Sequence, residues 1–305
     1  MVIRDPEVVS ILTLLGYNQN YSNFWEREAG TLIQGCRNTV IPQAANIIGN
    51  YAFAFCEGLE SIVIPVSVTT VQPSAFLHCD DLKELRLSAS VTKFYKSDYC
   101  QKLEKITVTQ ENPVYYGPQG SNAIIEKEGD ILIMGCKSTV IPNTVKIISE
   151  HSFEHVLGLK SISIPNSVEM ICDQAFYDCA YLESVSIPAS VTFIGGSSWN
   201  EPEDLTMDRM RNAFSYCPNL KHITVDSQNA VYDSRNNCNA VIIKSQASML
   251  IATANSFEPE SVNSTHFSAY TTLETWKWEP DYLSTSQVFP DGRMIHTYIA
   301  GDDDD

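Results

Sequence analysis

The stretch that decides the fold is Leu59–Leu82, which reads LESIVIPVSVTTVQPSAFLHCDDL. Within it, Ser61–Ile64 has apolar side chains at alternate positions, a pattern that predicts a short strand. Phe76, Cys79 and Leu82 follow at intervals of three, and this spacing predicts a helical turn with one apolar face. A segment of this length is too short to fold back and bury both surfaces alone. It therefore needs copies of itself on either side.

The chain supplies these copies at regular spacing. Pro42 and Pro65 are 23 residues apart, and the same interval separates the other landmarks of the quoted stretch from their counterparts. A longer period lies on top, because the landmarks of Cys36–Leu82 recur 100 positions later in Cys136–Leu182. Periods of about 20–50 residues indicate solenoids, and a Leu-x-x-Leu-x-Leu core in a unit of about 20–29 residues is typical of leucine-rich repeats.

The unit resembles a known family. Segments of the form LxSIxIPxSVTxIxxxAFxxCxxL resemble the BspA-like leucine-rich repeats of bacterial and some protist surface proteins, and 159–182 (LKSISIPNSVEMICDQAFYDCAYL) is close to that form. The segments 112–115 (NPVY) and 122–136 resemble the hairpin spacer between blocks of repeats in this family. The resemblance runs from about Gly30 to about Pro280. It implies a secreted or surface-exposed binding solenoid and names no ligand, since a fold does not determine a function.

The predicted fold class is an α/β repeat. We expect a leucine-rich-repeat solenoid with short parallel strands on the concave face, short helical turns on the convex face and β-hairpin junctions between blocks. One solenoid should span 1–305, with an N-terminal cap at 1–29, two full blocks and one eroded block of repeats at 30–280, and a C-terminal cap with an acidic tail at 281–305. Five phenylalanines are expected to be buried in one column: Phe53, Phe76, Phe153, Phe176 and Phe214. Tyr99 is expected at the position of Phe76, and the interruption at 197–211 on the convex side. Strands are predicted at 39–41, 62–64, 85–87, 106–108, 139–141, 162–164, 185–187 and, with Trp276 and Trp278 closing the core, at 273–279.

Charge and composition limit the possible partners. The formal net charge of −17 disfavours nucleic acid and docking on anionic lipid, and no apolar run reaches the ~18–20 residues of a membrane span. Val8–Leu15 is apolar but follows two acidic residues and lacks a small-residue cleavage site, so it is a poor signal peptide. An extracellular or cell-surface location is therefore expected from the family resemblance alone.

The residue types that carry catalysis or metal binding do not form a recognisable pattern. Cys56, Cys79, Cys179 and Cys217 occupy the same position in their repeats, with Val156 at the equivalent place in another, which predicts small buried thiols rather than disulfides or a zinc site. His151 and His155 are interpreted as a surface pair, and the acidic residues of 201–208 as a solvated loop rather than a calcium site. No common catalytic motif is present. We expect no enzyme activity, cofactor or metal.

The candidate binding surface follows from strand geometry. Side chains alternate between core and surface along a strand, so the outward positions of successive strands should form a ladder on the concave sheet. The alternative is that small residues only keep a curved sheet uncrowded. The predicted ladder consists of Ser61, Val63, Glu84, Arg86, Lys105, Thr107, Ser138, Val140, Ser161, Ser163, Ser184, Ser186, His222 and Thr224.

Two functions fit this ladder. A flat ribbon with one charged patch suits a protein or glycan partner better than a small molecule, which predicts an adhesion-type recognition module. The alternative is a structural or assembly module that acts as a rigid spacer, through self-association or a neighbouring domain. A monomer is expected for the first and self-association for the second. A glycan-cleaving enzyme would need a close carboxylate pair, which the sequence does not place.

Overall fold

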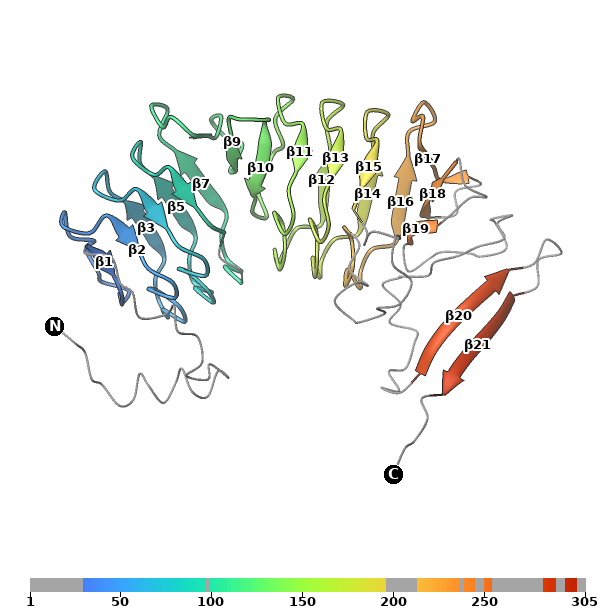
Figure 1. Ribbon diagram of the computed structural model, residues 1–305, viewed down its shortest axis with the longest axis horizontal. Helices are drawn as coiled ribbons and strands as arrows, with labels where there is room; N and C mark the ends of the chain where they lie inside the picture. Colours follow the sequence, from blue (N-terminus) through green and yellow to red (C-terminus); the bar gives the residue numbers. More distant parts are fainter. Residues whose placement is uncertain are drawn as a thin grey trace.

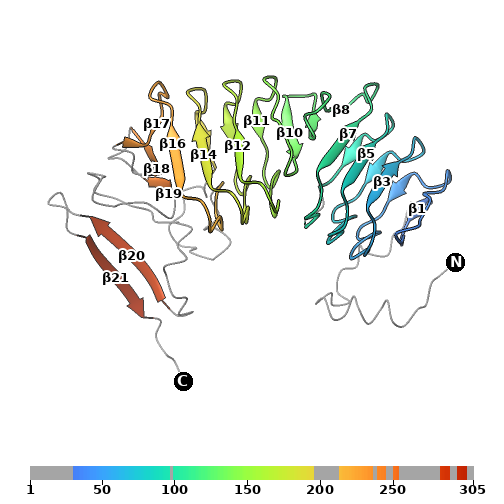
Figure 2. The same ribbon diagram turned by 180° about the vertical axis from the view of Figure 1, so that it is seen from behind.

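The computed structural model describes residues 30–96, 99–195, 213–235, 239–244, 250–253, 282–288 and 294–300. Within these residues the regular elements are all β-strands. From β1 to β17 the coils of the chain lie side by side in an arch, which is seen from both sides in Figures 1 and 2. The parallel-strand solenoid predicted from the repeats is confirmed, and its α component is not.

Six coils in the described part of the chain carry a strand of three or four residues along one edge. These strands pair in parallel with the strand one repeat away, so that Ser61 lies opposite Glu84 and Glu84 opposite Lys105. Buried and exposed residues alternate along them, as the sequence pattern predicts. Two three-stranded sheets result, β3 (Ser61–Ile64), β5 (Glu84–Leu87) and β7 (Lys105–Val108) in the first block, and β12 (Ser161–Ser163), β14 (Ser184–Ile187) and β16 (His222–Val225) in the second.

A second series of strands, each of two residues and not predicted from the sequence, runs along another edge of the coils. It arises at the Val-Thr-x-Ile part of the repeat, where one inward apolar residue follows one outward residue. Conversely, the predicted strands at 39–41 and 139–141 do not form, and both segments have irregular backbone. The short strands are β1 (Thr31–Leu32), β2 (Ile47–Ile48), β4 (Thr70–Val71) and β6 (Lys93–Phe94), then β11 (Ile147–Ile148), β13 (Met170–Ile171) and β15 (Phe193–Ile194).

The predicted helical turns are wrong. Tyr51 and Phe55 have φ angles of 59° and 56°, and a left-handed residue at every fourth position prevents a right-handed helix. The backbone instead donates to the adjacent coil, with Phe53 N–H bonded to Ala75 O and Phe55 N–H bonded to Leu77 O, each at 2.8 Å. The apolar spacing of three therefore reflects consecutive tight turns. The same pair of left-handed residues recurs at Ser74 and His78, His151 and His155, and Gln174 and Asp178.

An antiparallel hairpin separates the two blocks, as the spacer pattern predicts. Its strands are β9 (Ile124–Glu126) and β10 (Ile131–Met134), and β8 (Tyr115–Tyr116) pairs with β9. Ile124 packs into the core of the first block and its neighbour Ile125 into the core of the second. The hairpin is therefore a shared wall between two cores.

The junction recurs after the second block as β17 (Tyr232–Asp233), β18 (Ala240–Ile243) and β19 (Leu250–Thr253). A separate antiparallel hairpin is formed by β20 (Tyr282–Val288) and β21 (Met294–Ala300).

A buried asparagine ends each block. The Asn112 amide donates to the carbonyls of Ser88 and Val91 at 2.8 and 2.9 Å, and its oxygen accepts the N–H groups of Val114 and Tyr115. The Tyr115 hydroxyl then accepts the N–H of Phe94 at 3.0 Å. If the repeat continued, a backbone carbonyl of the next coil would accept this N–H instead. Asn229 and Tyr232 make the same contacts at the end of the second block. These two residues therefore satisfy the polar groups left by the last coil.

The predicted phenylalanines are all buried and form one stack in each block. Phe53 stacks on Phe76 with ring centroids 5.5 Å apart, and Phe153, Phe176 and Phe214 stack at 4.9 and 5.3 Å. The placement of Tyr99 in this series is wrong. Tyr99 instead has a φ angle of 60° and stacks on His78 at 4.2 Å, because its coil is two residues shorter than the 23-residue repeat.

The repeated cysteines are buried free thiols, as predicted, and each of three also makes a specific contact. Cys79, Cys179 and Cys217 donate from Sγ to the carbonyl oxygens of Phe53, Phe153 and Phe176 in the preceding coil, at 3.0–3.2 Å. Burial raises the pKa of the Cys79 and Cys217 thiols to about 12. The thiol is therefore a link between coils as well as a small apolar group.

Several expectations lie outside the described residues. These are the N-terminal cap at 1–29, the interruption at 197–211 and the last strand at 273–279 with its tryptophans. The division of the chain into caps and blocks stays a prediction.

We expect Phe176→Ala to lower the free energy of unfolding by about 3–5 kcal/mol, since it leaves a cavity between two stacked rings. Urea titration followed by circular dichroism measures the change. Phe193→Ala, at an exposed ring of the same block, is the matched control and should cost far less. Equal losses for the two variants would contradict the assigned register.

Alkylation of the native protein, read residue by residue by mass spectrometry, should separate the thiols. Cys36 is exposed and hydrogen bonding from Thr39 lowers its pKa, so it should react first. Cys79, Cys179 and Cys217 should react only on unfolding, because burial suppresses the thiolate. Rapid native labelling of these three would show that the coils open.

Candidate functional site

The predicted ladder residues lie on the outer face of the longer strands. The twelve positions in β3, β5, β7, β12, β14 and β16 are exposed, except that Glu84 and Ser184 are half-buried. Ser138 and Val140 are also exposed but lie in coil. The structure therefore gathers the predicted residues into a first-block group and a second-block group, and we call the whole surface the ladder face. Its position on the concave side stays a prediction.

A charged patch occupies the first-block part of the ladder face. Glu84 is only 21% exposed and lies between Arg86 and Lys105, at 2.7 and 2.8 Å from Oε1. The hydrogen bonds from Arg86 and Lys105 lower the pKa of Glu84 from 4.5 to about 2. The three residues carry a net charge of +1 on a strongly acidic protein. The patch thus presents two fixed cations around one ionised carboxylate.

The second-block part of the ladder face is formed by hydroxyl groups. Parallel pairing places Ser163, Ser186 and Thr224 in one row across three strands. This row borders a shallow hollow of about 360 Å³, whose rim includes Asn166 and Asp226. The surface offers neutral donors and acceptors with one carboxylate.

A larger hollow lies where the ladder face is interrupted. Its volume is about 810 Å³, and one wall consists of residues 104–108, which include the whole of β7. The rest of the lining comes from residues 116–120 and Asn122 of the junction, from Gln110 and from Ser138, whose hydroxyl donates to the Glu104 carbonyl oxygen. In the described part of the chain β7 pairs only with β5, so the hollow occupies the place of the next strand.

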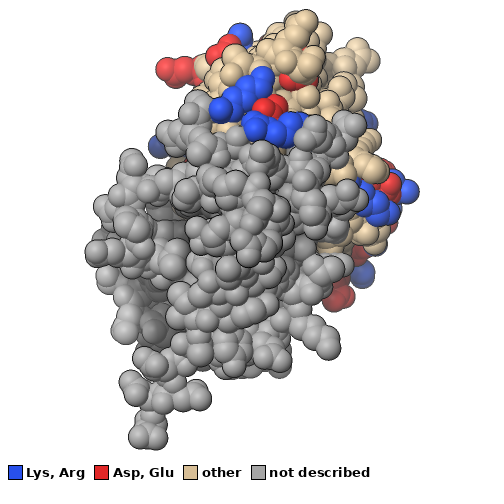
Figure 3. All heavy atoms as spheres, turned by 90° about the vertical axis from the view of Figure 1, so that its right-hand side faces the viewer, with Lys and Arg blue, Asp and Glu red and all other residues tan. Residues whose placement is uncertain are grey.

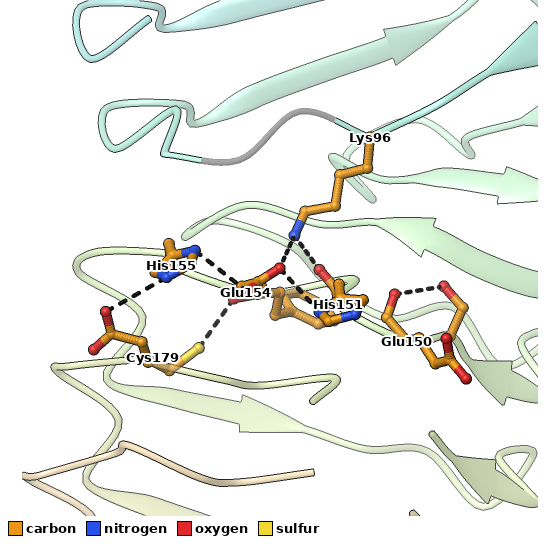
Figure 4. Close-up of polar contacts among 9 residues, drawn as sticks. Lys96, Glu150, His151, Glu154, His155 and Cys179 are labelled. Carbon is orange, nitrogen blue, oxygen red and sulfur yellow. Dashed lines mark hydrogen bonds and ion pairs between the residues drawn. The ribbon is translucent and has the colours of Figure 1, made fainter. Parts of the chain in front are cut away.

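The two blocks are also joined by side chains across the junction. Lys137 lies 2.9 Å from Glu104 at the edge of the ladder face. On the turn side, Lys96 reaches from the first block to the His151 carbonyl and to Glu154, which is 3.8 Å away, as Figure 4 shows. Glu154 therefore receives a cation from the other block.

The surroundings of Glu154 keep it ionised. Burial raises its pKa, but the hydrogen bond from His151 and the charges of Lys96 and His155 outweigh burial, so the net pKa is lowered. His151 lies 3.0 Å and His155 3.7 Å from the carboxylate. The interpretation of the two histidines as a surface pair is wrong for His155, whose side chain is 10% exposed and stacks on Tyr99 at 3.8 Å.

Sequence reasoning missed this cluster because Lys96 and Glu154 are 58 residues apart and belong to different repeat positions. At the offset of 100, Glu154 corresponds to Ala54 and His155 to Phe55. The replacement of two apolar residues by ionisable ones was the feature of the sequence that could have indicated the cluster. Among the residues that the structure describes, no three His, Cys, Asp or Glu side chains gather in a group that could hold a metal ion. No helix in that part of the chain could span a membrane.

Charged side chains elsewhere pair between neighbouring coils. Lys83 lies 3.2 Å from Glu60 and Lys102 lies 2.7 Å from Asp81, and in the second block Lys146 lies 2.9 Å from Glu169. Figure 3 shows basic and acidic side chains next to one another on the described part of one end of the molecule. Exposed pairs of this kind each add only about 0–1 kcal/mol of stability.

The repeats match the model of a known protein family. A model of the BspA type leucine-rich repeat region matches residues 34–116 and 134–235 in six copies. These segments make up more than half of the chain, which therefore belongs to the BspA type leucine-rich repeat family.

Solved structures of bacterial repeat proteins are similar to the chain. They include a leucine-rich repeat protein from Eubacterium ventriosum (20% identity, 60% of this chain and 58% of that chain, TM-score 0.40). A leucine-rich cell surface protein from Faecalibacterium prausnitzii has 21% identity over 69% of this chain and 50% of that chain, with a TM-score of 0.39. The pneumococcal vaccine antigen PcpA has 21% identity over 61% and 55%, with a TM-score of 0.38. The chain spans about half the length of these structures. No curated protein matches it.

The contribution of Glu84 to stability should depend on pH. Its folded-state pKa is depressed, so the ionised form stabilises the fold above the ordinary pKa of 4.5, and this stabilisation is lost as the pH falls toward 2. We expect Glu84→Gln to lower the melting temperature at pH 7 and the difference from wild type to narrow by pH 3. Glu111→Gln, at an exposed residue, should show no such difference. A difference in melting temperature between wild type and Glu84→Gln that stays constant from pH 7 to pH 3 would refute the ion-pair assignment.

Proposed function

We propose that this chain is a non-enzymatic recognition module, exposed at a cell surface, that binds a protein partner through the ladder face. The observation that carries the proposal is the charged patch, in which Arg86 and Lys105 are held in place by Glu84 at 2.7 and 2.8 Å. Cations that are already positioned lose little side-chain entropy on binding an acidic surface. The surface location rests on the family resemblance.

A protein partner is favoured over a glycan for a further reason. The ladder face runs over three consecutive paired strands in each block, which gives a broad and rigid surface rather than a closed pocket. Broad surfaces of this kind are characteristic of protein–protein interfaces, whereas small ligands bind in concave sites that enclose them. Glycan binding by the hydroxyl row is the alternative outcome of the experiment below.

The experiment is a binding screen of the full chain against arrayed extracellular-matrix proteins and glycans. We expect a protein hit whose affinity falls at least tenfold in the double variant Arg86→Glu, Lys105→Glu. The matched control is Lys93→Glu, Lys146→Glu, which changes the charge equally at exposed residues on the short-strand side and should bind normally. Hits confined to glycans, or equal losses in both variants, would contradict the proposal.

Self-assembly is the second candidate, and one observation favours it. Val63 and Val140 are 61% and 65% exposed on the ladder face, so a second copy could cover them. Light scattering at several concentrations tests this function. A mass that rises toward two copies, and that Val63→Lys abolishes, would support assembly over recognition of a different partner.

A further inference from the structure

The large hollow beside β7 lies against the edge of a strand. Residues 104–108 all line it, although Ile106 and Val108 point their side chains into the core. A hollow on a sheet face would meet only alternate residues, since side chains alternate between the two faces. Contact with consecutive residues therefore means that the hollow exposes the backbone of β7.

The direction of the backbone groups follows from the pairing. Lys105 N–H donates to Lys83 O and Thr109 N–H to Leu87 O, both at 3.0 Å and both toward β5. N–H and C=O groups alternate in direction along a parallel strand, so those of Ile106 and Val108 point away from β5. They face the hollow, and no strand in the described part of the chain pairs with them.

In the second block, one carbonyl of the equivalent strand edge is covered by a side chain. Ile223, which is 117 residues after Ile106, has its carbonyl oxygen bonded by the Ser234 hydroxyl at 3.1 Å. The residue equivalent to Ser234 in the first block is Gly117, which has no hydroxyl. A side chain there would place Cβ only 2.5 Å from the Ala123 carbonyl oxygen. The Ile106 carbonyl therefore lacks the hydroxyl that covers the Ile223 carbonyl, although the Glu104 carbonyl just before β7 accepts the Ser138 hydroxyl.

The charges around the hollow are not symmetric. Lys105 lies on its β7 wall and shares Glu84 with Arg86, which leaves the patch with a net charge of +1. Glu104, the acidic residue of the same wall, is paired with Lys137 at 2.9 Å. A strand placed beside β7 would thus meet Lys105 as its nearest incompletely neutralised charge, and an acidic side chain would complement it.

We propose that this hollow binds an extended peptide segment of a partner protein, which adds to the edge of β7 as a further strand and places an acidic side chain against Lys105. The open edge presents donors and acceptors at the spacing of a polypeptide backbone over the ~13 Å length of a four-residue strand. The main-chain bonds supply affinity, and Lys105 supplies selectivity. The inference rests on the proposed function and specifies one mode of protein binding.

The probe is a phage-displayed library of random linear heptapeptides, selected on the full chain. We expect enriched peptides to contain Asp or Glu and, as synthetic peptides, to bind with a Kd below 1 mM. Gln119→Trp, which fills the exposed rim of the hollow, should weaken binding at least tenfold. Gln228→Trp makes the same change at an exposed turn of the second block and should bind as wild type.

Amide hydrogen exchange tests strand pairing directly. A peptide that bound elsewhere on the surface would not slow exchange at the backbone amides of β7. Bound peptide should slow exchange at Ile106 and Val108 by at least tenfold and leave Thr107 unchanged, because its N–H already donates toward β5. The proposal is overturned if no peptide is enriched, if Gln119→Trp binds as tightly as wild type, or if the Ile106 and Val108 amides do not slow. If the peptide proposal fails in one of these ways but Arg86→Glu still abolishes binding of the protein partner, the proposed function of the ladder face is still supported.

Discussion

The structure depends on backbone hydrogen bonds that pass from one coil to the next. A 23-residue coil cannot satisfy its own N–H and C=O groups, and the left-handed residues in its turns direct several of them toward the neighbour. Each such residue costs about 1–2 kcal/mol in isolation, so the coil is stable only when another coil accepts its bonds. Asn112 and Asn229 matter for the same reason, since they supply the missing partners where a block ends.

The sequence predicted the features that depend on apolar spacing. The alternating strands, the phenylalanine stacks and the buried thiols all follow from which side chains must leave water, and periodicity reports this directly. The helical turns were wrong because Phe76, Cys79 and Leu82 have the same spacing in a helix as in consecutive turns, and only the backbone angle at His78 distinguishes the two. The ladder residues were predicted individually, but the hollow beside β7 was not. It results from a missing strand, and a pattern of residues that are present does not indicate it.

The junction between the blocks is more than a spacer. Within the core, β9 serves both sides, because Ile124 and Ile125 face opposite blocks. At the ladder face Lys137 contacts Glu104, and on the turn side Lys96 contacts Glu154 while Tyr99 stacks on His155. The two cores are thereby joined through the shared strand β9 and by side-chain contacts at two surfaces. The interruption of the sheet at β7 is consequently a local opening in an otherwise continuous structure.

Because its bonds run from coil to coil, the solenoid has a characteristic response to mechanical tension. A pull applied between its two ends acts along the hydrogen bonds that join successive coils, so the terminal coil should detach first and the others should follow in order. Each detached coil of the regular repeat releases 23 residues, or about 75–80 Å of extended chain. The chain would therefore lengthen in repeated steps of similar size and absorb work at each one. A module at a surface under flow would behave as an extensible tether rather than as a rigid rod.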